Sequence, residues 1–150
     1  MPTFLLDSSV MVAAVCSWHE HHVAAIEEIE RRLGRRETMM VAAPTLVETY
    51  AVLTRLPSPH RLSSQDAKNL IEGNFINEYA CIALDKNDYR RLVLEAPGND
   101  VSGGRTYDWV IALCAQKAKS SALLTFNVRD FTSFSLQGVE IFLPKASESA

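Results

Sequence analysis

Short apolar runs recur along the chain, each bounded by polar or turn-forming residues. Runs of this length are typical of buried strands, whereas helices usually need about ten residues or more. No Asn-Gly or similar two-residue turn joins one run to the next, so hairpins are not expected. We predict strands at residues 3–6, 39–42, 79–84, 122–125 and 139–143.

Helical periodicity fills most of the intervals between these runs. Apolar residues recur there at every third or fourth position, as on one face of a helix. One such face carries Val23, Ile26, Ile29 and Leu33. Helices are predicted at residues 9–16, 20–33, 45–56, 64–75, 89–94 and 109–118. Because strands and helices alternate, the sequence predicts an α/β fold in which helices flank a parallel sheet.

Capping residues mark the start of several helices. Ser63 or Ser64 can cap the helix that runs to about residue 75, and Asp85 can cap the next one, because these side chains accept hydrogen bonds from free N–H groups. Thr106 is expected to cap the last long helix. Asp108 would then lie in its first turn, where the helix dipole favours a negative charge.

The composition indicates one soluble globular domain. The chain has 150 residues, of which 47% are hydrophobic and 22% charged, and this length is close to the commonest domain size. We expect the domain to span residues 1–143 and a polar tail to occupy residues 144–150. No apolar run approaches the roughly 20 residues of a membrane span, and no basic leader precedes the first strand, so a cytoplasmic protein is expected.

The net charge of −3 argues against broad electrostatic capture of nucleic acid, which depends on Lys and Arg. A local basic cluster nevertheless lies at the end of the second predicted helix, with Arg31, Arg32, Arg35 and Arg36. We interpret it as a solvated helix end favoured by the dipole, with a phosphate contact as the alternative. The three cysteines, Cys16, Cys81 and Cys114, lack metal-binding spacing and are expected to be reduced core thiols.

An aspartate interrupts the first apolar segment, FLLDSSV. Asp7 has apolar neighbours on both sides, and a carboxylate stripped of water needs a cation, hydrogen-bond donors or a metal ion to compensate it. The sequence therefore predicts a partner for Asp7 elsewhere in the chain.

Glu48, Asn127 and Asp130 also follow predicted strands, and Asp108 opens the helix that precedes the fourth strand. Because ligands bind beyond the carboxyl ends of parallel strands, we expect them to converge at one rim of the sheet. The candidates are Asp7, Glu48, Asp108, Asn127 and Asp130. Close carboxylates repel one another, and a cation between them reverses the sign of the interaction. Oxygen ligands without His or Cys favour Mg²⁺ or Mn²⁺, which can activate water for attack on a phosphodiester.

The segments FLLDSSV, VAAPTLVETYAVL, TYDWVIALCAQK and LLTFNVRDF together resemble the PIN-domain ribonucleases, and among them the VapC-type toxins. The resemblance covers residues 3–143. It implies a three-layer α/β/α fold with a central, mainly parallel five-stranded sheet, and a Mg²⁺- or Mn²⁺-dependent endoribonuclease that cuts tRNA or ribosomal RNA. It also implies a homodimer and a cognate antitoxin protein, whose C-terminal segment would lie along a helical groove. The amphipathic helices at residues 20–33 and 45–56 are the candidates for that groove, with ordinary core packing as the alternative.

By this resemblance Asp7, Glu48 and Asp108 are the metal-binding and catalytic acids. The fourth motif departs from the commonest family pattern, because Asn127 stands where many members have an aspartate. An amide is a weaker, uncharged ligand. We expect Asn127 to face the site, and Asp130 to assist it or to cap a short helix.

Two further segments allow alternative interpretations. His19, His21 and His22 lie too close in sequence to share one helix face as zinc ligands, so exposed imidazoles at a helix start are expected. Trp18 is expected to pack against the protein rather than to stack on a base. Arg105 is a candidate for an RNA phosphate contact or a loop arginine without a role.

Two rival functions remain open from sequence. One is a small phosphohydrolase with Asp7 as nucleophile, although such enzymes commonly have a second acid two residues later, where this chain has Ser9. The other is a binding module that has kept the fold and lost the metal.

Overall fold

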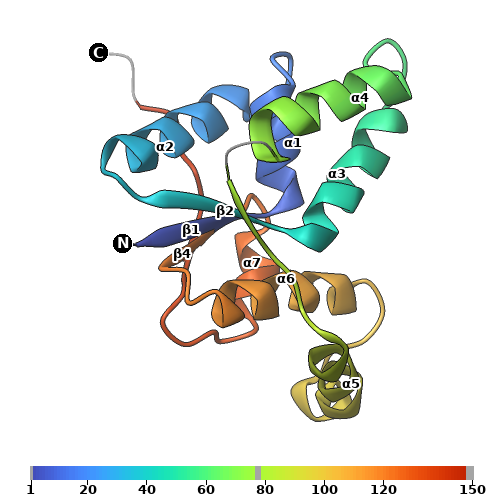
Figure 1. The fold of residues 1–150 in the computed structure, drawn as a ribbon, viewed down its shortest axis with the longest axis vertical. Helices are drawn as coiled ribbons and strands as arrows, with labels where there is room; N and C mark the ends of the chain where they lie inside the picture. The colour runs from blue at the N-terminus through green and yellow to red at the C-terminus, as the bar shows by residue number, and fades with distance from the viewer. Residues whose placement is uncertain (1, 77–78, 148–150) are drawn as a thin grey trace.

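A computed structural model describes residues 2–76 and 79–147. Its strands form one five-stranded sheet in the order β3-β2-β1-β4-β5, and every neighbouring pair is parallel. Figure 1 shows helices on both sides of this sheet. The predicted parallel five-stranded sheet is therefore confirmed. The strands are β1 (Thr3–Leu6), β2 (Thr38–Ala42), β3 (Ala80–Ile82), β4 (Ala122–Leu124) and β5 (Glu140–Phe142).

The helices agree with the predicted positions to within a few residues, and one short additional helix, α7, follows β4. The helices are α1 (Ser8–Val15), α2 (His22–Gly34), α3 (Ala43–Thr54), α4 (Ser64–Ile71), α5 (Lys86–Glu95), α6 (Arg105–Lys117) and α7 (Val128–Thr132). A π-helical turn, η1 (Glu72–Ile76), extends α4, and a 3-10 turn, η2 (Pro97–Asn99), follows α5.

The central strand β1 explains why the first apolar run is continuous rather than alternating. It pairs with β2 on one side and β4 on the other, and Phe4, Leu5 and Leu6 are fully buried. A parallel sheet is covered on both faces, so successive buried residues of its central strand all need apolar side chains.

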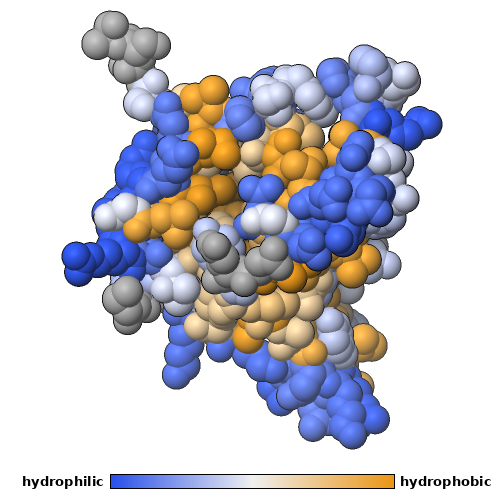
Figure 2. Space-filling view, turned by 45° about the horizontal axis from the view of Figure 1, so that its top comes forward, coloured by the Kyte–Doolittle hydropathy of each residue, from blue (hydrophilic) through white to orange (hydrophobic). Residues whose placement is uncertain are grey.

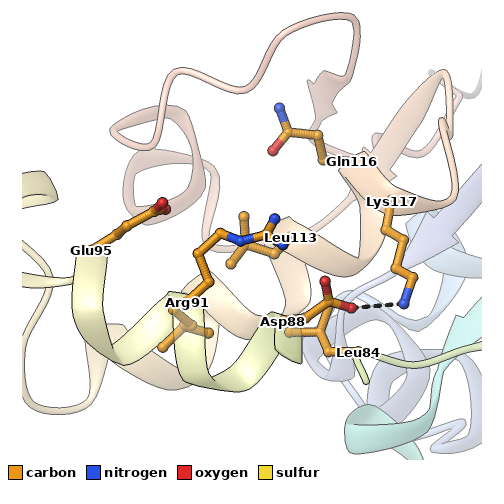
Figure 3. A pocket seen from close by; sticks show the side chains of 8 residues that line it. Leu84, Asp88, Arg91, Glu95, Leu113, Gln116 and Lys117 are labelled. Carbon is orange, nitrogen blue, oxygen red and sulfur yellow. Dashed lines mark hydrogen bonds and ion pairs between the residues drawn. The ribbon is translucent and has the colours of Figure 1, made fainter. Parts of the chain in front are cut away.

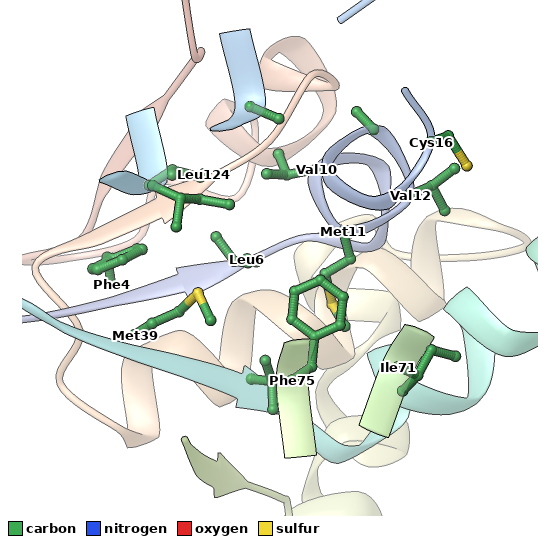
Figure 4. Close-up of a cluster of buried hydrophobic side chains, with 14 of the residues drawn as sticks. Phe4, Leu6, Val10, Met11, Val12, Cys16, Met39, Ile71, Phe75 and Leu124 are labelled. Atoms are coloured by element: carbon green, nitrogen blue, oxygen red, sulfur yellow. The ribbon is translucent and has the colours of Figure 1, made fainter. Parts of the chain in front are cut away.

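Two apolar clusters fill the space between the sheet and its two helical layers. Phe4 and Leu6 point to one face, where they join side chains of α1, α2, α3 and α4, as part of Figure 4 shows. Leu5 points to the opposite face and packs with α5, α6 and α7. The alternation follows from the two-residue repeat of a strand. The predicted three-layer α/β/α arrangement is confirmed.

Helix caps agree with the sequence in two cases and differ in one. Ser63 accepts a hydrogen bond from the backbone N of Asp66, and Asp85 and Asp88 form a reciprocal capping box. The expected cap by Thr106 is wrong, because α6 already begins at Arg105 and its N-cap, Gly104, offers no side chain.

The basic cluster at the end of α2 is not uniformly solvated, as the sequence had suggested. Arg32 is only 7% exposed, and its guanidinium donates to Glu28 at 2.8 Å and to Glu37 at 3.0 Å. It also lies over the Phe142 ring, 4.7 Å from the ring centre. The ion pair occupies part of the buried helix face, which a search for apolar periodicity alone does not register.

Two apolar residues are more exposed than predicted. Val23 is 55% exposed, because the buried face of α2 is formed by neighbouring positions that include Ala24 and Ala25. Cys81 is exposed because β3 is an edge strand, whereas Cys16 and Cys114 are buried free thiols as expected. On the face drawn in Figure 2, hydrophilic residues surround a more apolar middle.

Among the described residues, no helix combines the length and apolar character that crossing a membrane requires. The beginning of the predicted polar tail lies against α2, where the Ser147 backbone N donates to Glu27 Oε2 at 2.7 Å. Met1 and the last three residues of the tail, 148–150, lie outside the described residues.

Candidate functional site

Asp7 lies directly beyond β1, at the N-cap of α1, and is 3% exposed. Its Oδ2 accepts hydrogen bonds from the Ser9 hydroxyl at 2.7 Å and the Thr125 hydroxyl at 2.9 Å. No ion pair within the described part of the chain includes Asp7. The compensating partners of this carboxylate are therefore hydroxyl groups, one of them from a distant segment.

These hydroxyls also bind the loop after β4. Ser9 Oγ accepts from the backbone N of Phe126 at 3.1 Å, and Thr125 Oγ1 accepts from the backbone N of Asn127 at 2.9 Å. Each hydroxyl thus donates to Asp7 and accepts from the loop. The network fixes Oδ2 and leaves Oδ1 outside these hydrogen bonds.

Glu48 reaches the same rim from α3. This helix starts at Ala43, immediately after β2, so Glu48 stands little more than one turn above the strand end. Its Oε1 accepts a hydrogen bond from the Ser8 hydroxyl at 2.9 Å, which ties α3 to the start of α1. Glu48 remains exposed to solvent.

Asp108 lies in the first turn of α6 and is partly buried. Its pKa is raised from 3.8 to about 6, first by burial and then by the charges of Asp7, Asp130 and Glu48, while Arg105 acts in the opposite direction. Interactions of this kind require proximity, because charge repulsion falls with distance. The four predicted acids therefore converge at one rim.

The two candidate residues of the fourth motif, Asn127 and Asp130, take different positions at the site. Asn127 is the N-cap of α7, yet its side chain makes no capping hydrogen bond, and it lines a hollow beside Ser8 and Ser9. Asp130 lies in the first turn of α7 and adds its charge to the field at Asp108. Thr125 and Ser8 were not predicted as site residues, although each directly adjoins a strand end or a candidate acid.

The oxygen donors suit a hard divalent cation, and the raised pKa of Asp108 indicates uncompensated negative charge that such a cation would relieve. Within residues 2–76 and 79–147, however, no three His, Cys, Asp or Glu side chains are grouped closely enough to hold a metal ion. The fit is therefore to an ion such as Mg²⁺, which needs one or two carboxylates and completes its shell with water and substrate oxygens.

Two hollows adjoin the acid cluster. One, of about 790 Å³, lies between α3, α5 and α6 and includes Glu48 and Asp108 in its wall. The other, of about 370 Å³, is lined by Ser8, Ser9 and Asn127 among other residues. A long substrate could therefore approach the acids from either side.

A third hollow, of about 480 Å³, lies between α5 and α6 and has none of the candidate acids in its wall. Figure 3 shows Arg91 reaching toward it from α5 and the Asp88–Lys117 pair at its side. Lys117 Nζ lies 2.7 Å from Asp88 Oδ2, and this hydrogen bond lowers the pKa of Asp88. The pair joins two helices, and we assign no catalytic role to it.

Arg105 and the histidines also differ from their sequence interpretation. Arg105 is the first residue of α6 rather than a loop residue; it donates to the Ser133 hydroxyl and lies over the Phe134 ring at 4.2 Å. The three clustered histidines, His19, His21 and His22, are partly buried rather than fully exposed.

A family model of the PIN domain matches residues 4–135. The chain belongs to the PIN domain family. This PIN domain is 36% identical over 137 residues to Ribonuclease VapC40 of Mycobacterium tuberculosis, in a match that covers 91% of the chain and 96% of that relative. It is 29% identical over 140 residues to Ribonuclease VapC27 of the same species, covering 93% of the chain and 96% of the relative. The resemblance to PIN-domain proteins of the VapC type is confirmed.

Solved structures support the same fold for this PIN domain. Mycobacterium tuberculosis VapC20, described as a toxin that cleaves the sarcin-ricin loop, superposes with a TM-score of 0.69 at 15% identity, covering 91% of this chain and 98% of that one. DNA-bound VapBC from Salmonella typhimurium gives a TM-score of 0.65 at 20% identity, covering 95% and 98%. At these identities the likeness shows the fold alone.

Proposed function

We propose that this PIN domain is a metal-dependent endoribonuclease and the toxin of a toxin-antitoxin pair. The observation that carries the proposal is the meeting of acids from four separate segments at one rim of the sheet, where Asp7, Glu48 and Asp130 lie near enough to act on Asp108. The names of the relatives, Ribonuclease VapC40 and VapC27, point to the same activity. The proposed substrate is RNA, with tRNA or ribosomal RNA as the target class and the cytoplasm as the compartment.

Asp7, Glu48 and Asp108 are the proposed acids of a Mg²⁺ or Mn²⁺ site, in which one or two of them would bind the ion directly and the rest through bound water. When bound, the ion would lower the pKa of a coordinated water and neutralise the phosphate oxygens. The protein's part is to hold the oxygens in place. Asp7 is oriented by two hydroxyls, so little reorganisation is needed at its Oδ1 when a ligand arrives.

Asn127 and Asp130 are proposed to complete the site on its open side. The Asn127 amide lies beside the Asp7 network and makes no capping hydrogen bond, so it can donate to a phosphate oxygen or accept from a water. Asp130 acts through charge, since it raises the proton affinity of Asp108. Cation binding and deprotonation of Asp108 would therefore be coupled.

The proposed partners are an antitoxin protein and a second copy of the chain. VapBC2 from Rickettsia felis and VapBC from Salmonella typhimurium have been solved bound to DNA. We propose that an antitoxin segment lies along α3 in the hollow that contains Glu48 and Asp108, where it would obstruct the acids. The exposed apolar residues of α5, Val93 at 68% and Leu94 at 82%, are candidates for a homodimer contact.

The test is cleavage of total RNA with Mg²⁺ or Mn²⁺, followed by sequencing of the new RNA ends. Asp7→Asn, Asp108→Asn and chelation should each reduce cleavage by about 100-fold or more, whereas Glu30→Gln, an exposed acid of α2, should leave it unchanged. Hydrolysis of small phosphate esters alone would favour the Asp7-nucleophile alternative. Absence of both activities and of metal binding would favour the binding module.

A further inference from the structure

A series of ring contacts leads away from the acid cluster. It joins His60, Trp18, His19, His21 and Phe126, which we call the ring track. Trp18 stacks on His60 with centroids 3.9 Å apart and planes at 19°, and His21 stacks on Phe126 at 4.4 Å and 16°. His19 links the two pairs, at 5.7 Å from Trp18 and 5.6 Å from His21.

Three separate loops supply these rings. Trp18, His19 and His21 precede α2, His60 lies between α3 and α4, and Phe126 follows β4. The backbone N of Phe126 donates to Ser9 Oγ, the hydroxyl that also binds Asp7. One end of the ring track is therefore attached directly to the group that orients the catalytic carboxylate.

The ring track is accessible, unlike the chain's other tryptophan. Trp18 is 46% exposed, whereas Trp109 is 7% exposed and belongs to the core. The His19 ring is oriented by the backbone N of His21, which donates to its Nδ1 at 3.0 Å. Nδ1 of the neutral ring is thus the acceptor, and Nε2 carries the proton and can donate to a ligand.

The hollow beside the ring track has a wall suited to a base rather than a phosphate. His19, His21 and Phe126 line it together with Ser8, Ser9 and Asn127. Glu20 is the charged residue of its described wall, which contains no Lys or Arg. A phosphate there would meet an anion without a compensating cation, whereas a base offers a flat face to the rings and donor and acceptor edges to the hydroxyls, imidazoles and amide.

A metal site does not account for the same residues. Within the part of the chain that the structure describes, no three His, Cys, Asp or Glu side chains are grouped for coordination. His60 and His21 instead stack face to face on Trp18 and Phe126, and His19 lies tilted between the two pairs. Unpaired bases can stack on aromatic rings of this kind.

We propose that the ring track binds unpaired bases of single-stranded RNA next to the phosphate held at the acids. The inference rests on the proposed function and gives it a substrate-positioning surface. It predicts a preference for an RNA loop or single strand over a duplex, because only unpaired bases can stack on these rings.

The test uses the Asp7→Asn protein without divalent cations and a short fluorescently labelled oligouridylate as the probe. Stacking on Trp18 should quench its fluorescence, and this quench should vanish in a Trp18→Phe background that still binds the RNA by anisotropy. Trp18→Ala and His21→Ala should each weaken binding by about 5- to 100-fold. Leu143→Ala, an exposed apolar change just after β5, is the matched control and should bind like the parent.

An oligonucleotide with abasic sites provides a test that does not depend on how a variant folds. It should bind the unchanged ring track as weakly as the intact RNA binds Trp18→Ala. The inference is overturned if RNA binds without a quench, or if Trp18→Ala and His21→Ala bind as tightly as Leu143→Ala. A quench without any cleavage of total RNA by the wild type would overturn the proposed nuclease alone, and cleavage without a quench would overturn the ring track alone.

Discussion

The Thr125 hydroxyl donates to Asp7 Oδ2 at 2.9 Å, although the two residues are 118 positions apart in the chain. Both residues are buried, and the contact joins the ends of the neighbouring strands β1 and β4. The bond therefore belongs to the fold as much as to the candidate site, because it stabilises a buried carboxylate and at the same time fixes its direction.

Thr125→Val should destabilise the protein, since it removes one of two donors to a buried charge while keeping the side-chain shape. We expect a loss of about 1.5–3 kcal/mol in the free energy of unfolding, measured in urea. RNA cleavage should fall as well, because Asp7 can then rotate. Thr54→Val, which removes an exposed hydroxyl bonded to the helix backbone, is the control and should cost about 0.5 kcal/mol or less. Equal losses for the two variants would contradict the assigned role of Thr125.

Asp108→Asn should stabilise the metal-free protein at neutral pH. The folded-state pKa of Asp108 is raised from 3.8 to about 6, so the folded state binds its proton more tightly than the unfolded state. The contribution of Asp108 to the free energy of unfolding therefore falls as the pH rises from about 4 to about 6, and it remains at the lower value above that range. Allowing for solvent screening at this partly exposed group, we expect a gain of about 1–2 kcal/mol for the variant at pH 7.5.

Urea unfolding of wild type and Asp108→Asn at several pH values measures this difference directly. The gap should grow between pH 4 and 6 and then remain constant up to neutral pH. A gap that is independent of pH would show that the carboxylate charge is not its cause.

Mg²⁺ or Mn²⁺ should raise the melting temperature of the wild type, because a ligand that binds only the folded state stabilises it by mass action. The effect should be larger at pH 7.5 than at pH 5, since the protonated Asp108 is a poor ligand at the lower pH. Asp7→Asn should abolish most of it, and Glu30→Gln should not. A rise of the same size in wild type and Asp7→Asn would place the ion elsewhere.

Arg32→Met should be strongly destabilising, although Arg32 is not among the proposed site residues. It leaves Glu28, which is 1% exposed, without its main cation, and removes the guanidinium that lies over Phe142. We expect a loss of about 3–5 kcal/mol in unfolding free energy. Arg35→Met, an exposed neighbour at the end of the same helix, should change stability by about 0.5 kcal/mol or less. A small effect at Arg32 would mean that Glu28 finds another partner.

The sequence by itself determined the local elements and much of the candidate site. Apolar runs and helical spacing depend on neighbouring residues, so β1, α2 and α6 could be located within a few positions, and the alternation of strands and helices indicated a parallel sheet. Because the carboxyl ends of parallel strands share one rim, Asp7 and Asp108 could be expected to meet before any coordinates were known.

The tertiary structure alone decided which distant groups touch. The strand order places β4 beside β1, and only that placement brings the Thr125 hydroxyl to Asp7. The burial of Arg32 and the stacking of Trp18 on His60 likewise depend on contacts between segments far apart in the chain. A one-dimensional pattern records the preferences of a residue for burial and backbone shape, whereas hydrogen bonds and ring contacts between loops depend on positions that exist only once the sheet has assembled.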